Sequence, residues 1–444
     1  MNYLVDDIIG TIFQFIPTSD YKSILTSSSY FPTIALKFLP FFLNDYYIFP
    51  GSFSEIDFKY LIQNQYLSRY YLFLYAIKNK FNGFVKILLQ DPRCSSINNN
   101  EAIHYATVSK NIKATKLLLK DPKLDPTMEY NGCTPLINSI SLNSLEIAKI
   151  LLNDPRINPS VNFNEAIQIA SKYGNVNIVL LLLKDKRVDP GGKYNSAITN
   201  AVSNGSHKIV KELLKHPKVD PSCSENSLVL HATISKREKI VNLLICHKLV
   251  DPSVSLGSTN QNYVIRRVCK YGWIKTVKML LKDQRVDPGA HDNDALKKAV
   301  KYGHTKVVKL LLKDSRVDAS ACLNRAIKLA SELGYEKIVL VLLSNKKVLS
   351  SVMCHQIMVL AARCGHVKVV EILLTKFYKI FNSEIILSLW CASIANHLSV
   401  VKLLLSYSDI YFLLEYTNIR WTAIENGHNE VAELIKKQMN NIYL

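Results

Sequence analysis

The sequence predicts an all-helical solenoid of about twelve helix-turn-helix units, preceded by a small helical N-terminal region. The same pattern recurs over residues 70–444, and most of its turn residues are 31 positions apart. A small side chain stands four positions before almost every turn residue, and a Leu-rich segment follows the turn. Such self-similarity at a fixed period is typical of repeat architectures. The turn residues are Lys80, Lys110, Asn143, Gly174, Gly205, Lys236, Gly272, Gly303, Gly334, Gly365, Asn396 and Gly427.

Each unit predicts a short first helix, a turn, a second helix and a link. In residues 164–190, apolar residues recur at helical spacing before Gly174 and again after it. Glycine permits the backbone conformation that ends a helix. The link closes with Val188, Asp189 and Pro190, and proline stops any helix. A single unit has no core, so we expect stacking of neighbours to bury the apolar faces.

Residues 70–444 resemble the ankyrin repeat. The likeness is carried by Cys133-Thr-Pro-Leu136, which is close to the Thr-Pro-Leu-His of that family, and by the segments that begin at Gly303-His304 and Gly365-His366. Elsewhere Ala-Ile replaces Thr-Pro-Leu-His, as at Ala166-Ile167, and the period is nearer 31 than 33. This departure leaves the form of the link open. The resemblance implies a protein-binding module that is not an enzyme.

The resemblance also implies that the partner protein binds on a concave face, which is made by the ends of the first helices and the tips of the links. We therefore expect the two residues before each turn to contact the partner. They are Lys172, Tyr173, Ser203, Asn204, Lys270, Tyr271, Lys301, Tyr302, Glu332, Leu333 and, as a single residue, Arg363. A tyrosine beside a cation offers rigid apolar area and charge to a partner. The alternative is that these tyrosines only pack on the adjacent repeat.

Residues 1–45 do not follow the repeat and predict amphipathic helices, the first of them ended by Pro17. The likeness to a known family is carried by Leu4, Ile8, Ile9, Ile12, Phe13, Phe15, Ile16, Pro17, Asp20, Ser29 and Phe31. With these residues the region resembles an F-box, although Val5 replaces the usual early proline and the later tryptophan of that family is absent. The resemblance implies binding to a Skp-type adaptor of a cullin ubiquitin ligase, with the array as substrate receptor. The alternative is a helical cap on the first repeat. Residues 46–69 predict a packed linker. The expected adaptor-binding residues are Leu4, Ile8, Ile9, Ile12, Phe13, Ile16 and Pro17.

The chain has a formal net charge of +19, and the excess of cations belongs to the array. Cations of the links predict a basic ridge, which either complements the helix C-termini and keeps the array soluble or steers an acidic partner. Nucleic acid is the weaker partner class, because aromatic residues do not interleave along the ridge. The ridge residues are Lys120, Lys123, Lys184, Arg187, Lys215, Lys218, Lys282, Arg285, Lys313 and Arg316.

No phosphate-binding loop, dinucleotide-binding turn, zinc-protease helix or nucleophile elbow occurs in the sequence. We therefore expect no catalytic residue, no metal and no cofactor. The nine cysteines are scattered without a Cys-x-x-Cys pair, which fits a reducing compartment. With no secretory signal and no apolar span, we expect a cytoplasmic protein without a membrane segment. It acts either as a ligase receptor or as a free-standing scaffold or competitor.

One unit is longer than its neighbours, because Lys236 and Gly272 are 36 positions apart. The surplus lies in residues 253–262, which have the Ser, Gly and Asn content of an exposed turn. The helices on either side keep their pattern, so we expect the extra residues to bulge from the link. Insertions of this kind collect on one face of a solenoid. The insertion is either neutral or part of a contact patch with Lys270 and Tyr271.

Overall fold

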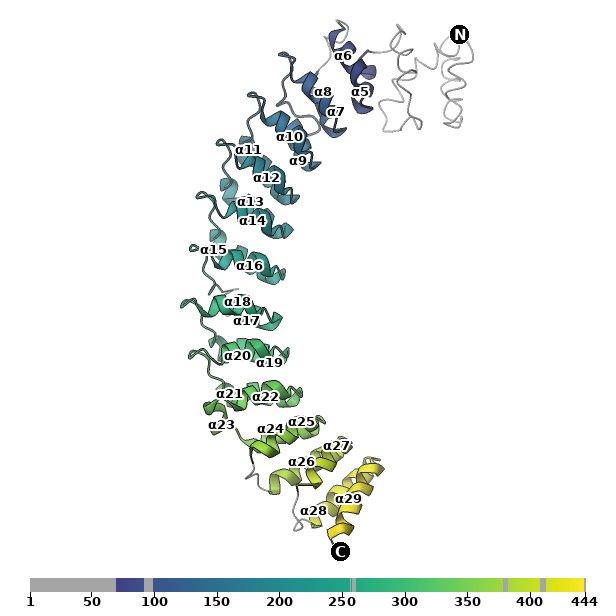
Figure 1. Ribbon diagram of the computed structural model, residues 1–444, viewed down its shortest axis with the longest axis vertical. Coiled ribbons are helices and arrows are strands. Elements are labelled where there is room, and N and C mark those ends of the chain that lie inside the picture. The colour runs from purple at the N-terminus through teal and green to yellow at the C-terminus, as the bar shows by residue number, and fades with distance from the viewer. Residues whose placement is uncertain are drawn as a thin grey trace, which may run out of the picture. The chain divides into compact units, whose positions relative to one another are not determined.

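A computed structural model describes residues 69–91, 99–255, 257, 261–377, 382–407 and 413–442. The F-box-like region and all but the last residue of the predicted linker lie outside these ranges. The chain divides into two units between Asn204 and Gly205, and each unit is described by itself. The described residues form 25 helices, numbered α5 to α29. They also contain an isolated antiparallel β-bridge between Tyr130 and Cys133. The predicted fold class, an all-helical solenoid of paired helices, is confirmed (Figure 1).

In the first unit, helix pairs follow one another in chain order. Its helices are α5 (Arg69–Lys78), α6 (Asn82–Gln90), α7 (Asn99–Val108), α8 (Ile112–Leu118), α9 (Pro135–Ser141), α10 (Leu145–Leu152), α11 (Val161–Lys172), α12 (Val176–Leu182) and α13 (Gly192–Asn204). Each first helix packs on the first helix of the next pair, from α5 through α7, α9 and α11 to α13. This stacking is what gives each pair a core.

The second unit continues the same arrangement. Its helices are α14 (His207–Leu213), α15 (Cys223–Ile234), α16 (Glu238–Ile245), α17 (Tyr263–Tyr271), α18 (Ile274–Leu281), α19 (Ala290–Lys301), α20 (Thr305–Leu311), α21 (Ala321–Glu332), α22 (Glu336–Leu343), α23 (Lys346–Ser351), α24 (Cys354–Arg363), α25 (Val367–Lys376), α26 (Asn382–Ile394), α27 (Leu398–Leu405), α28 (Leu413–Glu425) and α29 (Asn429–Ile442). No helix of the described residues is long and apolar enough to span a membrane.

All twelve turn residues identified in the sequence adopt the left-handed conformation, including the non-glycine residues Lys80, Lys110 and Asn143. The residue after the turn donates its N–H to the carbonyl of the small residue five positions earlier, as in Asn175 to Ala170 at 2.9 Å. This is the bond that closes a helix with a left-handed residue. The small residues are fully buried, because the neighbouring first helix packs against them.

The link between successive repeats, whose form the sequence left open, is built around a buried asparagine. Within the first turn of α11, residues Asn162, Phe163 and Asn164 are all left-handed, so the regular helix starts after them. Asn164 Oδ1 accepts the N–H of Asp189 in the next link at 2.7 Å. The same bond recurs 25 residues apart in the second unit, from Asp251 to Asn226 and at two later links. At the next link the hydroxyl of Ser351 donates to Asn324 Oδ1 instead, at 3.3 Å.

The long link keeps this asparagine, as Asn262. The N–H of Asn262 donates to the carbonyl of Ser253 at 3.1 Å, which closes the base of the insertion. Asn262 Oδ1 accepts the N–H of Asp287 at 2.8 Å, so the regular register resumes there. The extra residues therefore leave the stacking of α15 and α17 intact.

Candidate functional site

The predicted partner-binding residues occupy one register, at the C-terminal ends of α11, α13, α17, α19, α21 and α24. Eight of them are exposed, among them Tyr173 at 55%, Tyr302 at 44% and Leu333 at 39%. Lys270, Tyr271 and Glu332 are half-buried. We call the exposed surface of the first helices, with the left-handed tips at their N-terminal ends, the first-helix face.

Bonds between repeats fix the backbone of these positions. His304, which follows the turn of its own repeat, donates from Nε2 to the carbonyl of Lys270 at 2.9 Å. His366, His397 and His428 make the same 2.9 Å bond to the preceding first helix. The His304 ring also covers the turn of the repeat before it, since a Cβ on Gly272 would lie 2.6 Å from its Nδ1. These histidines position the first-helix face and leave its side chains available.

Two adjoining hollows lie on the first-helix face of the first unit. The larger one, about 570 Å³, is lined by residues of α11 and α13, including Gln168, Lys193 and Asn200. The smaller one, about 190 Å³, lies beside α9 and includes Tyr173. Both hollows share Glu165, Ile169 and Lys172 on α11. Lys172 and Tyr173, which the sequence singled out, therefore line a continuous recess across three repeats.

The left-handed tips of the first helices carry exposed apolar residues that were not predicted from the sequence. Phe163 is 75% exposed, Tyr194 is 92% exposed, and Leu323 in the second unit is 81% exposed. Each is the middle residue of three left-handed residues, a conformation that costs roughly 1–2 kcal/mol per residue for L-amino acids. The asparagine recurring every 31 residues in most links was the signal that could have located them.

In the second unit, cations lie over aromatic rings of the predicted pairs. Lys270 Nζ is 5.2 Å from the centre of the Tyr302 ring, one repeat further on. Lys236 Nζ is 5.6 Å from the centre of the Tyr271 ring, which also contacts Trp273 at 5.0 Å. Tyr271 thus packs mainly against its neighbours, whereas Tyr302 keeps an open surface.

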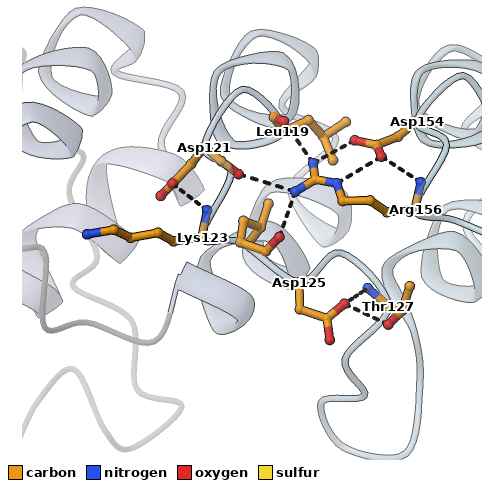
Figure 2. Close-up of polar contacts among 8 residues, drawn as sticks. Leu119, Asp121, Lys123, Asp125, Thr127, Asp154 and Arg156 are labelled. Atoms are coloured by element: carbon orange, nitrogen blue, oxygen red, sulfur yellow. Dashed lines mark hydrogen bonds and ion pairs between the residues drawn. The ribbon is translucent and has the colours of Figure 1, made fainter.

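Several link arginines are held by groups of the fold. Arg156 donates to the carbonyls of Leu119 (2.8 Å), Asp121 (3.2 Å) and Leu124 (2.7 Å) in the preceding link (Figure 2). Asp154 pairs with the same guanidinium at 2.7 Å, and the pKa of this carboxyl is lowered by the hydrogen bond from Arg156. Arg156 therefore neutralises an acid and joins two repeats.

The same arrangement recurs among the predicted ridge residues. Arg316 binds the carbonyls of Leu281, Asp283 and Val286 at 2.8, 3.3 and 2.6 Å, and pairs with Asp314. Arg187 and Arg285 pair with the aspartates two positions before them. Four aspartates in all carry a pKa lowered mainly by these arginines. Arg187 and Arg316 thus also bond to a carbonyl of the preceding repeat, whereas the bonds of Arg285 stay within its own link in the described residues.

No group of three or more potential metal-binding residues is present in the part of the chain that the structure describes. The recurring link aspartates accept backbone bonds two residues on, as Asp125 does from Thr127 at 2.9 Å. Burial raises the pKa of the Cys269 thiol, which favours its unreactive protonated form. A hollow of about 580 Å³ at the turns near Gly334 and Gly365 includes His366, whose Nε2 is bound to a carbonyl. These features fit structural roles.

The profile of a family described as ankyrin repeats (3 copies) matches residues 73–164, 166–256 and 265–352, which together are more than half of the chain. No curated protein matches the sequence. Helices α24 to α29 lie beyond the matched segments and repeat the same helix pair. The chain belongs to the ankyrin-repeat family.

Proposed function

We propose that the chain is a non-enzymatic scaffold that binds a partner protein through the first-helix face. Ankyrin repeats are in general protein-interaction modules. The observation that carries the proposal for this chain is the recess on α9, α11 and α13. Lys172 and Tyr173 line it, and the exposed tips Phe163 and Tyr194 lie beside it. Tyrosine in a pocket is among the side chains that dominate binding at protein interfaces, and Lys172 adds a charge beside it.

A peptide-display selection on the full chain tests this proposal. Selected binders are measured on wild type, on a Lys172→Glu plus Tyr173→Ala variant, and on a Leu180→Ala plus Lys184→Glu control. The control pair is exposed on α12 and the link of the same repeat. We expect affinity to fall at least tenfold on the first variant and to stay unchanged on the control. An equivalent Lys301→Glu plus Tyr302→Ala variant is measured as well. The proposal is contradicted if the selected binders keep their affinity for both variants.

The resemblance of residues 1–45 to an F-box supports a finer proposal, in which the scaffold is a substrate receptor of a cullin-type ubiquitin ligase. The competing function is a free-standing scaffold or competitor that only occupies its partner. Pull-down with a Skp-type adaptor separates them, using wild type and an Ile12→Asp plus Phe13→Asp variant. Adaptor binding that is lost in the variant supports the receptor. Absence of binding by wild type supports the free-standing scaffold.

A further inference from the structure

The first-helix face of the second unit is strongly basic over three consecutive repeats. Helices α17, α19 and α21 carry six cations that form no ion pair with a carboxylate in the described residues. Asp294 is occupied, because it pairs with Arg266 and with Lys298, each at 2.6 Å. Half-buried Glu332 is the remaining acid on these helices outside the tip residue Asp292. The six cations are Arg267, Lys270, Lys297, Lys301, Arg325 and Lys328.

Further along the same unit the first-helix face becomes apolar. Leu387, Trp390 and Ile394 are 43%, 46% and 43% exposed, and their spacing places them on one side of α26. Trp421 on α28 is 63% exposed and stands 31 residues after Trp390, at the equivalent position of the next repeat. Ile424 is 40% exposed beside it. Two exposed tryptophans with apolar neighbours are the composition of a protein interface.

The basic and apolar parts belong to one surface. Successive first helices pack against each other from α17 through α19, α21, α24 and α26 to α28. The change is visible at a single helix position, six residues before each turn. This position reads Arg266, Lys297, Lys328, Val359, Trp390 and Trp421 in successive repeats.

We infer that this surface receives one extended segment of a partner protein, acidic where it crosses α17 to α21 and apolar or aromatic where it crosses α26 and α28. The inference rests on the proposed function and specifies the partner's chemistry. Packed helices are about 8–10 Å apart and an extended chain advances about 3.3 Å per residue, so each repeat accommodates about three residues. Six repeats then take about 18 residues, with a carboxylate at about every third position of the acidic half.

Charge distribution favours a protein segment over nucleic acid. Helix α26 carries Glu384 and no Lys or Arg, and α28 carries Glu415 and Glu425 against a single Arg420. A phosphate backbone crossing this half would lose the cationic contacts on which nucleic-acid affinity depends. An apolar segment needs no cationic contact there, and the exposed rings of the two tryptophans offer it an apolar surface.

Fluorescence anisotropy with labelled synthetic 18-residue peptides tests the inference on the full chain. One peptide has Glu at every third position of its first half and Leu and Trp in its second, and another has the halves reversed. A third replaces every Glu by Gln, and a fourth scrambles the sequence. We expect one of the first two orders to bind, and the Gln and scrambled peptides to bind at least tenfold more weakly.

The array variants locate the binding. Affinity should fall at least tenfold with Lys270→Glu plus Lys301→Glu, and again with Trp390→Ser plus Trp421→Ser. It should be unchanged with Lys313→Glu plus Lys282→Glu, two exposed link lysines of the same repeats. Circular dichroism checks the folding of each variant. If the double tryptophan variant has a lower melting temperature than wild type, the single variant Leu387→Ser is used in its place.

Three results would overturn the inference: no binding of either order, binding that tolerates both face variants, or tighter binding of oligo(dT) through the same lysines. The display selection of the preceding section separates this failure from that of the scaffold function. If its binders depend on Lys172 and Tyr173 but lack acidic and apolar halves, the scaffold proposal stands and this one fails.

Discussion

Cations at the links and cations on the first-helix face differ in what surrounds them. Arg156 and Arg316 at the links each bind an aspartate and three carbonyls of the preceding repeat. Lys301 on the face is exposed and forms no ion pair in the described residues. Both kinds count equally in the net charge of +19. Net charge therefore does not tell a cation that stabilises the fold from one that is available to a partner. The groups that surround each cation make this distinction.

The links also differ from one another in the side chains that they carry. Four of them carry an aspartate and an arginine two residues apart, as at Asp154 and Arg156. Two others carry His216 with Lys218 and His247 with Leu249, where the histidine Nδ1 accepts the backbone N–H instead. Another link keeps the aspartate without the arginine, since Asp121 is followed by Lys123 and accepts its backbone N–H at 2.9 Å. The backbone bond therefore recurs where the ion pair with an arginine does not.

The largest effect should follow from removing a link arginine that joins two repeats. Arg316→Met deletes hydrogen bonds to three carbonyls and an ion pair, and hydrogen bonds to charged groups contribute about 1.5–3 kcal/mol. We expect the free energy of unfolding in urea to fall by about 2–3 kcal/mol. The matched control is Arg285→Met, because Arg285 pairs with Asp283 and reaches no carbonyl in the described residues. It should cost less than about 1 kcal/mol. Equal losses would contradict the joining role.

A smaller effect is expected from acid. The hydrogen bond from Arg316 lowers the pKa of Asp314 in the folded state, so its stabilising contribution is present above the unfolded value of 3.8. The contribution is lost as pH falls below that value through the lowered folded pKa. The free energy of unfolding in urea should therefore fall less between pH 6 and pH 3 in Arg316→Met than in wild type. Equal falls in the two proteins would show that the pair of Asp314 and Arg316 does not contribute to the acid sensitivity.

The smallest effect on stability is expected on the face. Lys301→Met replaces an exposed cation that has no ion pair in the described residues, and such surface changes are usually within about 0.5 kcal/mol. Its melting temperature should match that of wild type, while a binder selected for the face should lose affinity. A clear drop in melting temperature would mean that face lysines also hold the array together.

The sequence was sufficient to predict the repeats, because each one restates the same local physics. A left-handed turn residue, a buried small residue and a Leu-rich helix recur, so their positions were recognisable even at Lys80 and Lys110, where glycine is absent. Contacts between repeats were not predictable in this way. The bonds from Arg156 span 32 to 37 residues, and the tips Phe163 and Tyr194 depend on a strained left-handed turn.

The candidate site was predicted only in its register. Lys172, Tyr173, Lys301 and Tyr302 are exposed, as a contact surface requires. The apolar part at Trp390 and Trp421 was missed, since these tryptophans lie four or five residues before the positions that the resemblance implied. The F-box-like residues remain a prediction, because they lie outside the described ranges.

Amide hydrogen exchange of the full chain, alone and with a peptide selected for binding, tests most directly whether the partner binds the first-helix face. Bound peptide slows exchange where it covers the backbone or stabilises local structure. We predict slower exchange in the first helices and their left-handed tips, and unchanged exchange in the second helices and the links around Arg156 and Arg316. Slowing confined to the second helices or to those links would contradict the account.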